Sequence, residues 1–122
     1  MEVQIFGIRK SADTRAALRF FAERRITVHF VDLQERAASL RELRRFVQKF
    51  GVAALIHRES RRFGELGLGS ARLTDERWLA KLSVEPLLLR MPLVRWQQQL
   101  TIGPAPGVWQ EWVASGTPPP AG

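Results

Sequence analysis

Residues 1–33 carry a strand, a helix and a second strand in succession, and this pattern constrains the fold more than any other segment. Val3–Phe6 is short, β-prone and bounded by Gly7. From Ala12 to about Arg25 the apolar residues recur at helical spacing, and Thr27–Leu33 is again β-branched and aromatic. Two strands joined by one helix form a βαβ unit, which predicts parallel pairing and a right-handed crossover.

The first helix has a clear start signal and a predicted buried face. Ser11 stands where an N-cap belongs, and Asp13 in the first turn complements the helix dipole. The residues that share the predicted apolar face are Ala17, Leu18, Phe21 and Ala22.

The middle of the chain is predicted to be helical. Ser39–Glu42 matches a capping box, and Gly51 is a plausible C′ residue. A short helix over Val52–His57, a glycine-broken loop over Gly64–Gly69 and a helix from Thr74 follow. The expected buried residues are Leu43, Phe46, Val47 and Phe50 in the first of these helices and Trp78, Leu79 and Leu82 in the last.

Strands are predicted to return near the C-terminus. Leu87–Leu89 is an apolar run, and Leu93–Trp96 with Leu100–Gly103 indicates a β-hairpin. Gly107 opens a last helix with Val108, Trp109, Trp112 and Val113 near its apolar side. The element order predicts an α/β class and one domain over residues 1–115, followed by a disordered Pro-rich tail over residues 116–122.

The chain of 122 residues contains no cysteine, which excludes disulfides, thiolate metal sites and cysteine nucleophiles together. Its two histidines, His29 and His57, are too few for a histidine-rich metal site, so we expect no metal. Both are interpreted as structural or surface residues rather than ligands.

The net charge of +7 arises entirely within residues 1–63. A basic face that meets an acidic partner explains this distribution, and so does a solvated surface rich in arginine. No apolar run is long enough to span a membrane and no signal-peptide pattern opens the chain, so we expect a cytoplasmic protein without membrane contact.

Three sequence blocks resemble the arsenate reductase (ArsC)/Spx family. Phe6–Arg15 resembles the loop from first strand to first helix, where a redox cysteine opens the helix. In that alignment Ser11 takes the cysteine position, Arg15 a commonly basic position, and Thr14 the position of a second cysteine in Spx-type members.

The second and third blocks depart from the family at its arginines. Phe50–Arg58 with Phe63–Leu68 resembles the second block, in which His57 replaces an arginine. Glu85–Val94 resembles the third block, in which an arginine directly precedes a cis-proline. Here Met91 precedes Pro92, and we expect the peptide bond between them to be cis; Arg90 lies one position earlier.

The resemblance spans about residues 2–115 and implies a thioredoxin-like fold of βαβ, helical insertion and ββα. The family reaction passes through a thiolate, which a serine hydroxyl cannot replace. We therefore expect no catalytic residue of the family type, because Ser11, His57 and Met91 stand at the family's cysteine and arginine positions.

Three functions remain open on the sequence. The leading hypothesis is a non-catalytic protein-interaction or regulatory module without a cofactor. Its partner would be a protein with an acidic surface, such as RNA polymerase by analogy with Spx; direct nucleic-acid binding stays open. The alternative is a divergent arsenate reductase-like oxidoreductase or transferase that uses an external thiol such as glutathione. The third is an anion-binding module, whose candidate residues are Arg9, Lys10, Ser11, Arg15 and Arg90.

Some of these residues also have simpler interpretations. Ser11 serves either as a plain N-cap or, with His57 as a base, as a nucleophile. The tryptophans of the C-terminal third either pack in the core or form a protein-contact surface. These residues are Trp96, Trp109 and Trp112.

Overall fold

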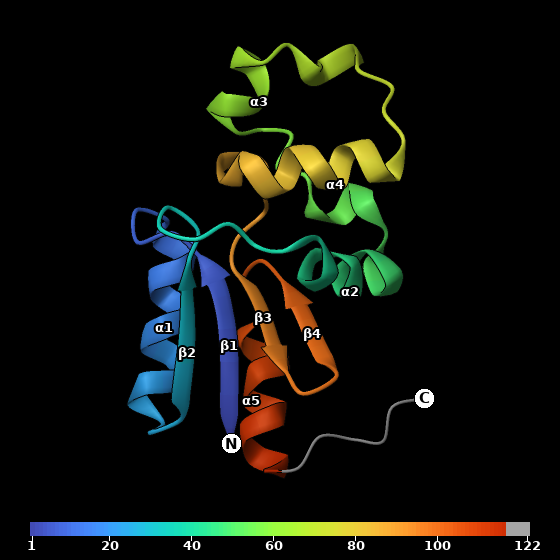
Figure 1. Cartoon of the computed structure of the whole chain (residues 1–122). Coiled ribbons are helices and arrows are strands. Elements are labelled where there is room, and N and C mark those ends of the chain that lie inside the picture. The colour runs from blue at the N-terminus through green and yellow to red at the C-terminus, as the bar shows by residue number, and fades with distance from the viewer. Residues whose placement is uncertain (117–122) are drawn as a thin grey trace. The chain divides into compact units, whose positions relative to one another are not determined.

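The structure is a computed structural model that describes residues 1–116. The predicted tail, residues 116–122, lies outside this range apart from Gly116. The described chain forms two compact units (Figure 1). The sheet unit consists of residues 1–32 together with those from 91 onward, and the helical unit consists of residues 33–90.

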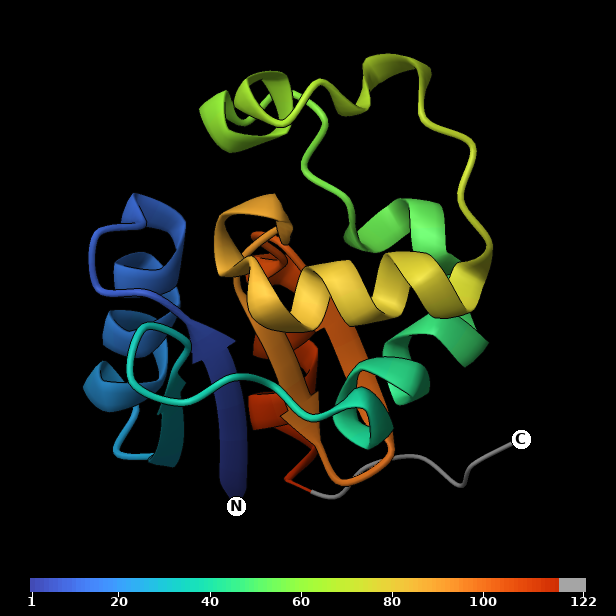
Figure 2. The same cartoon turned by 45° about the horizontal axis from the view of Figure 1, so that its top comes forward.

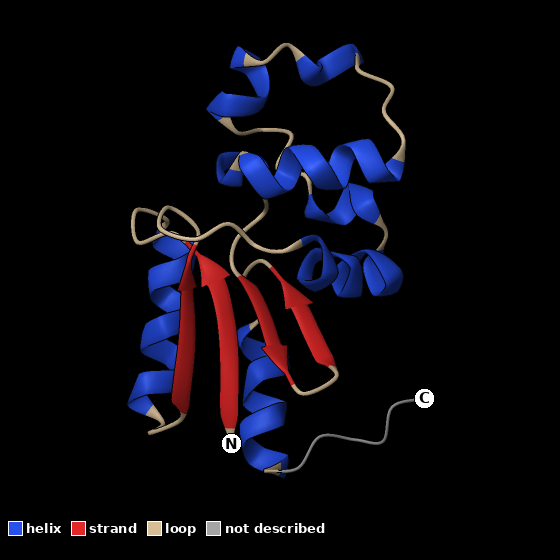
Figure 3. Ribbon diagram, viewed as in Figure 1, coloured by secondary structure: helices blue, strands red, loops and turns tan. Residues whose placement is uncertain are grey.

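The sheet unit contains all four strands, in the order β2-β1-β3-β4 (Figure 3). β1 pairs in parallel with β2, and β3 pairs antiparallel with both β1 and β4. The predicted parallel βαβ unit and the predicted hairpin are therefore confirmed. The elements of this unit are β1 (Glu2–Gly7), α1 (Ala12–Glu23), β2 (Thr27–Asp32), β3 (Leu93–Trp96), β4 (Gln99–Ile102) and α5 (Pro106–Ser115).

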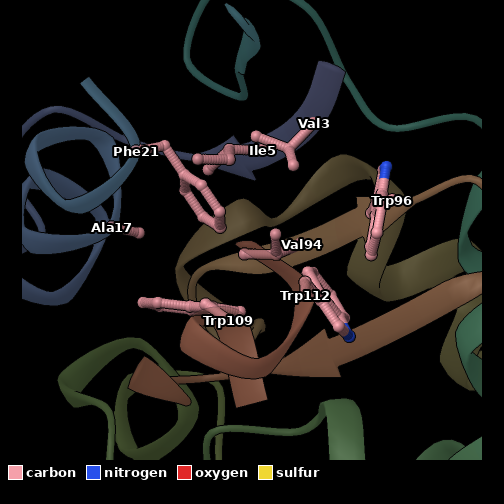
Figure 4. Close-up of a cluster of buried hydrophobic side chains, with 8 residues drawn as sticks. All are labelled: Val3, Ile5, Ala17, Phe21, Val94, Trp96, Trp109 and Trp112. Atoms are coloured by element: carbon pink, nitrogen blue, oxygen red, sulfur yellow. The ribbon is translucent and has the colours of Figure 1, made fainter. Parts of the chain in front are cut away.

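One core of the sheet unit lies between one face of the sheet and the helices α1 and α5. Figure 4 shows side chains from both helices pointing toward those of β1 and β3. Ile5 and Val94 are register partners in neighbouring strands, so their side chains share this face. The cluster consists of Val3, Ile5, Ala17, Phe21, Val94, Trp96, Trp109 and Trp112.

The three tryptophans of the C-terminal third are buried, so the packing interpretation is correct and the contact-surface interpretation is wrong. The indole Nε1–H of Trp109 donates a hydrogen bond of 2.8 Å to Thr101 Oγ1, which satisfies the polar end of the buried ring. The predicted buried face of α1 needs one correction. Ala22 is exposed, and Thr14 is buried in the turn before Ala17.

The helical unit contains no β-strand within residues 33–90. Figure 2 shows its longest two helices, α2 and α4, lying side by side. Its elements are α2 (Leu40–Phe50), η1 (Val52–Leu55), α3 (Arg61–Glu65), η2 (Leu68–Ser70), α4 (Asp75–Val84) and η3 (Pro86–Leu88).

The predicted capping box at the start of α2 is confirmed. Ser39 Oγ accepts from the backbone N–H of Glu42 at 3.1 Å, and Glu42 Oε1 accepts from the Ser39 N–H at 3.3 Å. Leu43 and Phe46 are buried as predicted, whereas Phe50 is 40% exposed. Phe50 is the last residue of the helix, where fewer neighbouring side chains can cover a large ring.

Two predicted segments of the helical unit adopt another conformation. Leu87–Leu89 is not a strand, because Pro86 begins the 3₁₀ turn η3 and the Leu89 N–H donates to Pro86 O at 3.0 Å. The predicted loop over Gly64–Gly69 is interrupted by helical turns. Ser60 Oγ accepts from the Phe63 N–H at 3.1 Å and so caps α3, while Phe63 is buried.

Among the residues that the structure describes, no helix combines the length and the apolar composition needed to cross a membrane.

Candidate functional site

The candidate site begins where β1 ends and α1 starts, both within the sheet unit (Figure 1). The Ser11 N–H donates to Ile8 O at 3.1 Å, which closes the turn between strand and helix. Ser11 has extended backbone angles, φ −76° and ψ 119°, and its Oγ accepts a hydrogen bond of 3.1 Å from the Thr14 N–H. Ser11 is therefore an N-cap, as one of its two interpretations predicted.

Two of the predicted cationic residues are held by contacts within the sheet unit. Arg15 Nη1 donates a hydrogen bond of 2.7 Å to the backbone oxygen of Arg9. The Arg9 guanidinium lies 3.7 Å from Asp32 Oδ2 and 5.0 Å from the centre of the Phe30 ring. Parallel pairing explains the ion pair, because Gly7 is the register partner of Asp32 and Arg9 follows two residues later.

The start of α1 therefore keeps only part of the positive charge that the sequence suggested. Asp32 offsets Arg9, and Asp13 lies in the first turn of the helix. Ser11 Oγ occupies the Thr14 N–H, which is one of the free donors of a helix N-terminus. Lys10 is exposed and stands beside these groups in sequence.

Thr14 is a buried residue of this region. In the sequence it is identified only through its alignment with the second cysteine of Spx-type members, which does not predict its packing. Its side chain is fully buried, and Oγ1 has no hydrogen-bond partner among residues 1–116. A Cβ built on Gly7 would clash with Oγ1 and Cγ2 of Thr14, so any side chain at the end of β1 would force Thr14 to shift. The sequence feature that could have indicated this close packing is Gly7, the glycine that ends the first strand.

His57 and Arg90 belong to the helical unit, where backbone pairing joins the second and third sequence blocks. Ile56 and Leu89 form an isolated antiparallel bridge. The His57 N–H donates to Leu88 O, and the Arg90 N–H donates to Leu55 O, both at 2.8 Å. The side chains of His57 and Arg90 are exposed. The structure thus brings these two positions together within one unit, on a pair of neighbouring segments.

Met91 and Pro92 belong to the sheet unit, and the peptide bond between them is cis. Pro92 is buried directly before β3, and its carbonyl oxygen accepts from the Gly103 N–H at 2.9 Å. Met91, at the family's arginine position, is half-buried.

The remaining histidine, His29, lies on β2 with its side chain exposed. His29 Nε2 lies 3.5 Å from Glu2 Oε2, and both residues line a shallow hollow of about 190 Å³ with Gln4 and Arg95. No group of three or more His, Cys, Asp or Glu side chains suited to a metal ion occurs within residues 1–116.

Two arginine–carboxylate pairs with contacts of 2.8 and 2.9 Å lie in the helical unit. Arg62 donates to both carboxylate oxygens of Glu85, at 2.9 and 3.0 Å. These hydrogen bonds lower the pKa of Glu85 and raise the pKa of Arg62. Arg44 Nη2 lies 2.8 Å from Glu76 Oε2, and this hydrogen bond raises the pKa of Arg44. Both pairs connect helical segments to each other.

Comparison with known proteins agrees with the fold and the sequence blocks. The ArsC family model matches residues 6–112. An arsenate reductase from Neisseria meningitidis serogroup A is 28% identical over 105 residues, which cover 84% of this chain and 90% of the relative. The serogroup B protein matches to the same extent.

Solved structures are similar over nearly the same span. An arsenate reductase from Vibrio cholerae aligns with a TM-score of 0.78 at 27% identity, over 91% of this chain and 97% of its own. The YffB protein aligns with a TM-score of 0.82 at 17% identity, over 89% of this chain and 96% of its own. At 17% identity, the similarity to the YffB protein shows the fold alone. The fold is thioredoxin-like α/β, in agreement with the sequence prediction. With its family model matched over most of its length, this cysteine-free chain belongs to the ArsC family.

Proposed function

We propose that this chain is a non-catalytic member of the ArsC family that acts as a protein-interaction or regulatory module. One observation carries the proposal: Ser11, at the family's cysteine position, uses its hydroxyl oxygen to cap α1 at 3.1 Å from the Thr14 nitrogen, in a chain without cysteine. A cap of this kind gives Ser11 a structural role, which is to stabilise the start of the helix.

The lost chemistry follows from the properties of the hydroxyl group. A thiolate at a helix N-terminus attacks an oxidised centre because its pKa lies near neutrality and sulfur forms mixed disulfides. A serine hydroxyl is neutral at pH 7 and has no redox cycle. Activation of Ser11 would need a general base, and the contact that its hydroxyl oxygen makes is instead with the Thr14 N–H.

The proposed partner is a protein with an acidic surface, met in the cytoplasm by a functional domain that spans residues 1–115. The excess charge of +7 within residues 1–63 supports an acidic partner, because complementary potentials steer association. The resemblance to Spx makes RNA polymerase the first partner to test.

An enzyme that uses an external thiol is the second candidate. The observation in its favour is Lys10, an exposed cation next to the N-terminus of α1, where an oxyanion could bind. Glutathione would then supply the sulfur, and the protein would supply only the anion pocket. The ion pair of Arg9 with Asp32 leaves this site with less positive charge than the sequence implies.

Arsenate reduction separates the two candidates. The unmodified protein is assayed with glutathione and glutaredoxin beside a cysteine-containing family enzyme and the Ser11→Cys variant. We expect no turnover above the protein-free rate for the unmodified chain. Turnover by the unmodified chain would refute the non-catalytic proposal and support the external-thiol enzyme.

Affinity capture tests the interaction itself. The full chain and the Ser11→Cys variant are used as baits at physiological salt, in lysates with and without nuclease treatment. Recovery of the same defined protein by both baits supports an interaction that does not depend on the residue at position 11. Recovery of nothing but salt-sensitive nucleic acid would count against a protein partner.

A further inference from the structure

Helix α2 carries a row of three cations on one stripe of its surface. Arg41, Arg45 and Lys49 follow one another at intervals of four residues. At 1.5 Å of rise per residue, neighbouring side chains are about 6 Å apart along the helix and the whole row is about 12 Å long. Arg41 and Lys49 are exposed, and Arg45 is half-buried.

None of the three cations of the row forms an ion pair within the part of the chain that the structure describes. No carboxylate of residues 1–116 lies within 4.0 Å of these three cations. The neighbouring Arg44, in contrast, is paired with Glu76 at 2.8 Å. The corresponding stripe of α1, which starts with Arg15 and Arg19, ends in an acid, Glu23.

Two features of this arrangement are unfavourable for the helix on its own, although Lys49 stands in the last turn, where the helix dipole favours a cation. Like charges at four-residue spacing repel each other on a helix surface. Arg41 also stands in the first turn, where the helix dipole disfavours a cation. A partner that places anions along the row would reduce both the repulsion between the cations and the unfavourable interaction of Arg41 with the helix dipole. Both reductions would contribute favourably to the free energy of binding.

An apolar side chain lies beside the row at the C-terminal end of α2, which supports a protein as the partner. Phe50 is 40% exposed there. The Lys49 ammonium lies 5.4 Å from the centre of the Phe50 ring, so a cation and an aromatic surface adjoin at one end. Aromatic and apolar side chains together with arginines are typical of protein interfaces.

We propose that the α2 row, Arg41, Arg45 and Lys49 with Phe50 beside Lys49, is the docking surface for an acidic helical segment of the partner. Carboxylates at four-residue intervals on that segment would repeat at the same spacing of about 6 Å and so oppose the cations one to one. This inference rests on the proposed interaction function and assigns its contact surface.

An NMR titration of the isotope-labelled full chain tests the surface directly. The probe is a helical peptide with three glutamates at four-residue spacing and leucines at both ends. A second peptide of the same composition carries its glutamates on different sides of the helix. A short single-stranded oligonucleotide is the third probe. Amide shifts report where each probe binds, even when binding is weak.

Two matched variants distinguish the effect of the row on peptide binding from the effect of the net charge of the chain. The first replaces the row, Arg41→Gln, Arg45→Gln and Lys49→Gln, and the second replaces three other exposed cations, Arg19→Gln, Arg58→Gln and Arg72→Gln. Both variants lose the same charge, and glutamine has a helix propensity close to that of arginine and lysine. The NMR spectrum of each free variant verifies its fold.

We expect the spaced peptide to shift amides of residues 40–50 and to bind the row variant about tenfold more weakly, at roughly 0.5 kcal/mol per exposed pair. The control variant should bind within about twofold of the unmodified chain. Shifts elsewhere, equal weakening in both variants, or equal affinity for the two peptides would overturn the inference. Tighter binding of the oligonucleotide at the row would replace it with a nucleic-acid site.

Failure of this surface is distinguishable from failure of the proposed function. If affinity capture with the row variant recovers the same defined partner as the unmodified chain, the module stands and only the docking surface is wrong. Turnover of arsenate would refute the module itself.

Discussion

Thr14 packs so closely against Gly7 that a Cβ on the glycine would clash with Oγ1 and Cγ2 of Thr14. Gly7 is the last residue of β1, and Thr14 lies in the first turn of α1. This contact fixes how closely the first turn of α1 approaches the end of β1. Ser11, which stands at the family's cysteine position, lies between these two elements. The candidate site therefore depends on a packing contact as well as on its polar groups.

The first prediction concerns this contact. Gly7→Ala should lower the free energy of unfolding by about 1–3 kcal/mol, because a methyl group is forced into a packed position. Thr14→Ala removes the two closest atoms, so the double variant should be more stable than the sum of the single changes implies. Urea unfolding of the four proteins measures the coupling. Strict additivity of the two changes would contradict the proposed clash.

A second prediction isolates the hydroxyl group of Thr14. Oγ1 is buried without a hydrogen-bond partner among residues 1–116, so its desolvation is uncompensated. Thr14→Val keeps the shape and removes that cost, so we expect stability to be unchanged or higher by about 1 kcal/mol. Thr14→Ser, which keeps the hydroxyl and leaves a cavity, is the matched comparison. A marked loss in Thr14→Val would reveal a hydrogen bond that the hydroxyl makes.

The third prediction concerns Ser11. If the residue is a helix cap, Ser11→Ala should lower stability by about 1 kcal/mol, while Ser11→Asp should retain it, because aspartate is an equally good cap and favours the dipole. Thermal unfolding at pH 7 measures both. Equal losses in the two variants would argue against the capping role.

Local signals in the sequence predicted most of the fold. The βαβ unit followed from two short β-prone runs around one amphipathic helix, and the capping box at Ser39 followed from four residues. These features depend on neighbours in the chain. The turn at Leu87–Leu89 was mispredicted because three leucines fit a buried strand or a buried turn equally well, and Pro86 decided between them.

The candidate site was less accessible to sequence reasoning. The cap at Ser11 is a local signal, and it was predicted correctly. The neutralisation of Arg9 by Asp32 depends on strand pairing, which brings the end of β2 beside the end of β1. The contact between Gly7 and Thr14 depends on how closely a helix packs, which periodicity does not specify.

The fourth prediction uses the Arg62–Glu85 pair. The two hydrogen bonds from Arg62 lower the pKa of Glu85 in the folded state. A depressed carboxyl pKa adds stability above the pKa of the unfolded chain, and this stability is lost as the pH falls through the folded-state pKa. The NMR titration midpoint of Glu85 should therefore lie below the ordinary value of about 4.3.

Two substitutions verify the cause. Arg62→Gln should move the Glu85 midpoint upward and reduce the loss of stability between neutral and acidic pH. Arg61→Gln removes a neighbouring cation whose ion pair is with Glu65, so it should leave the Glu85 midpoint unchanged. An unchanged midpoint in Arg62→Gln would show that another group controls Glu85.

The fifth prediction separates helix stability from binding at Arg41. A cation in the first turn of α2 opposes the helix dipole and repels Arg45 one turn later. Arg41→Glu reverses both effects and should raise the free energy of unfolding by about 1 kcal/mol, with about half that gain in Arg41→Gln. If the α2 row docks an acidic segment, the same substitution should weaken binding of the spaced-glutamate peptide. Opposite changes in stability and affinity are the expected result, because a purely solvated surface charge would alter the first without the second.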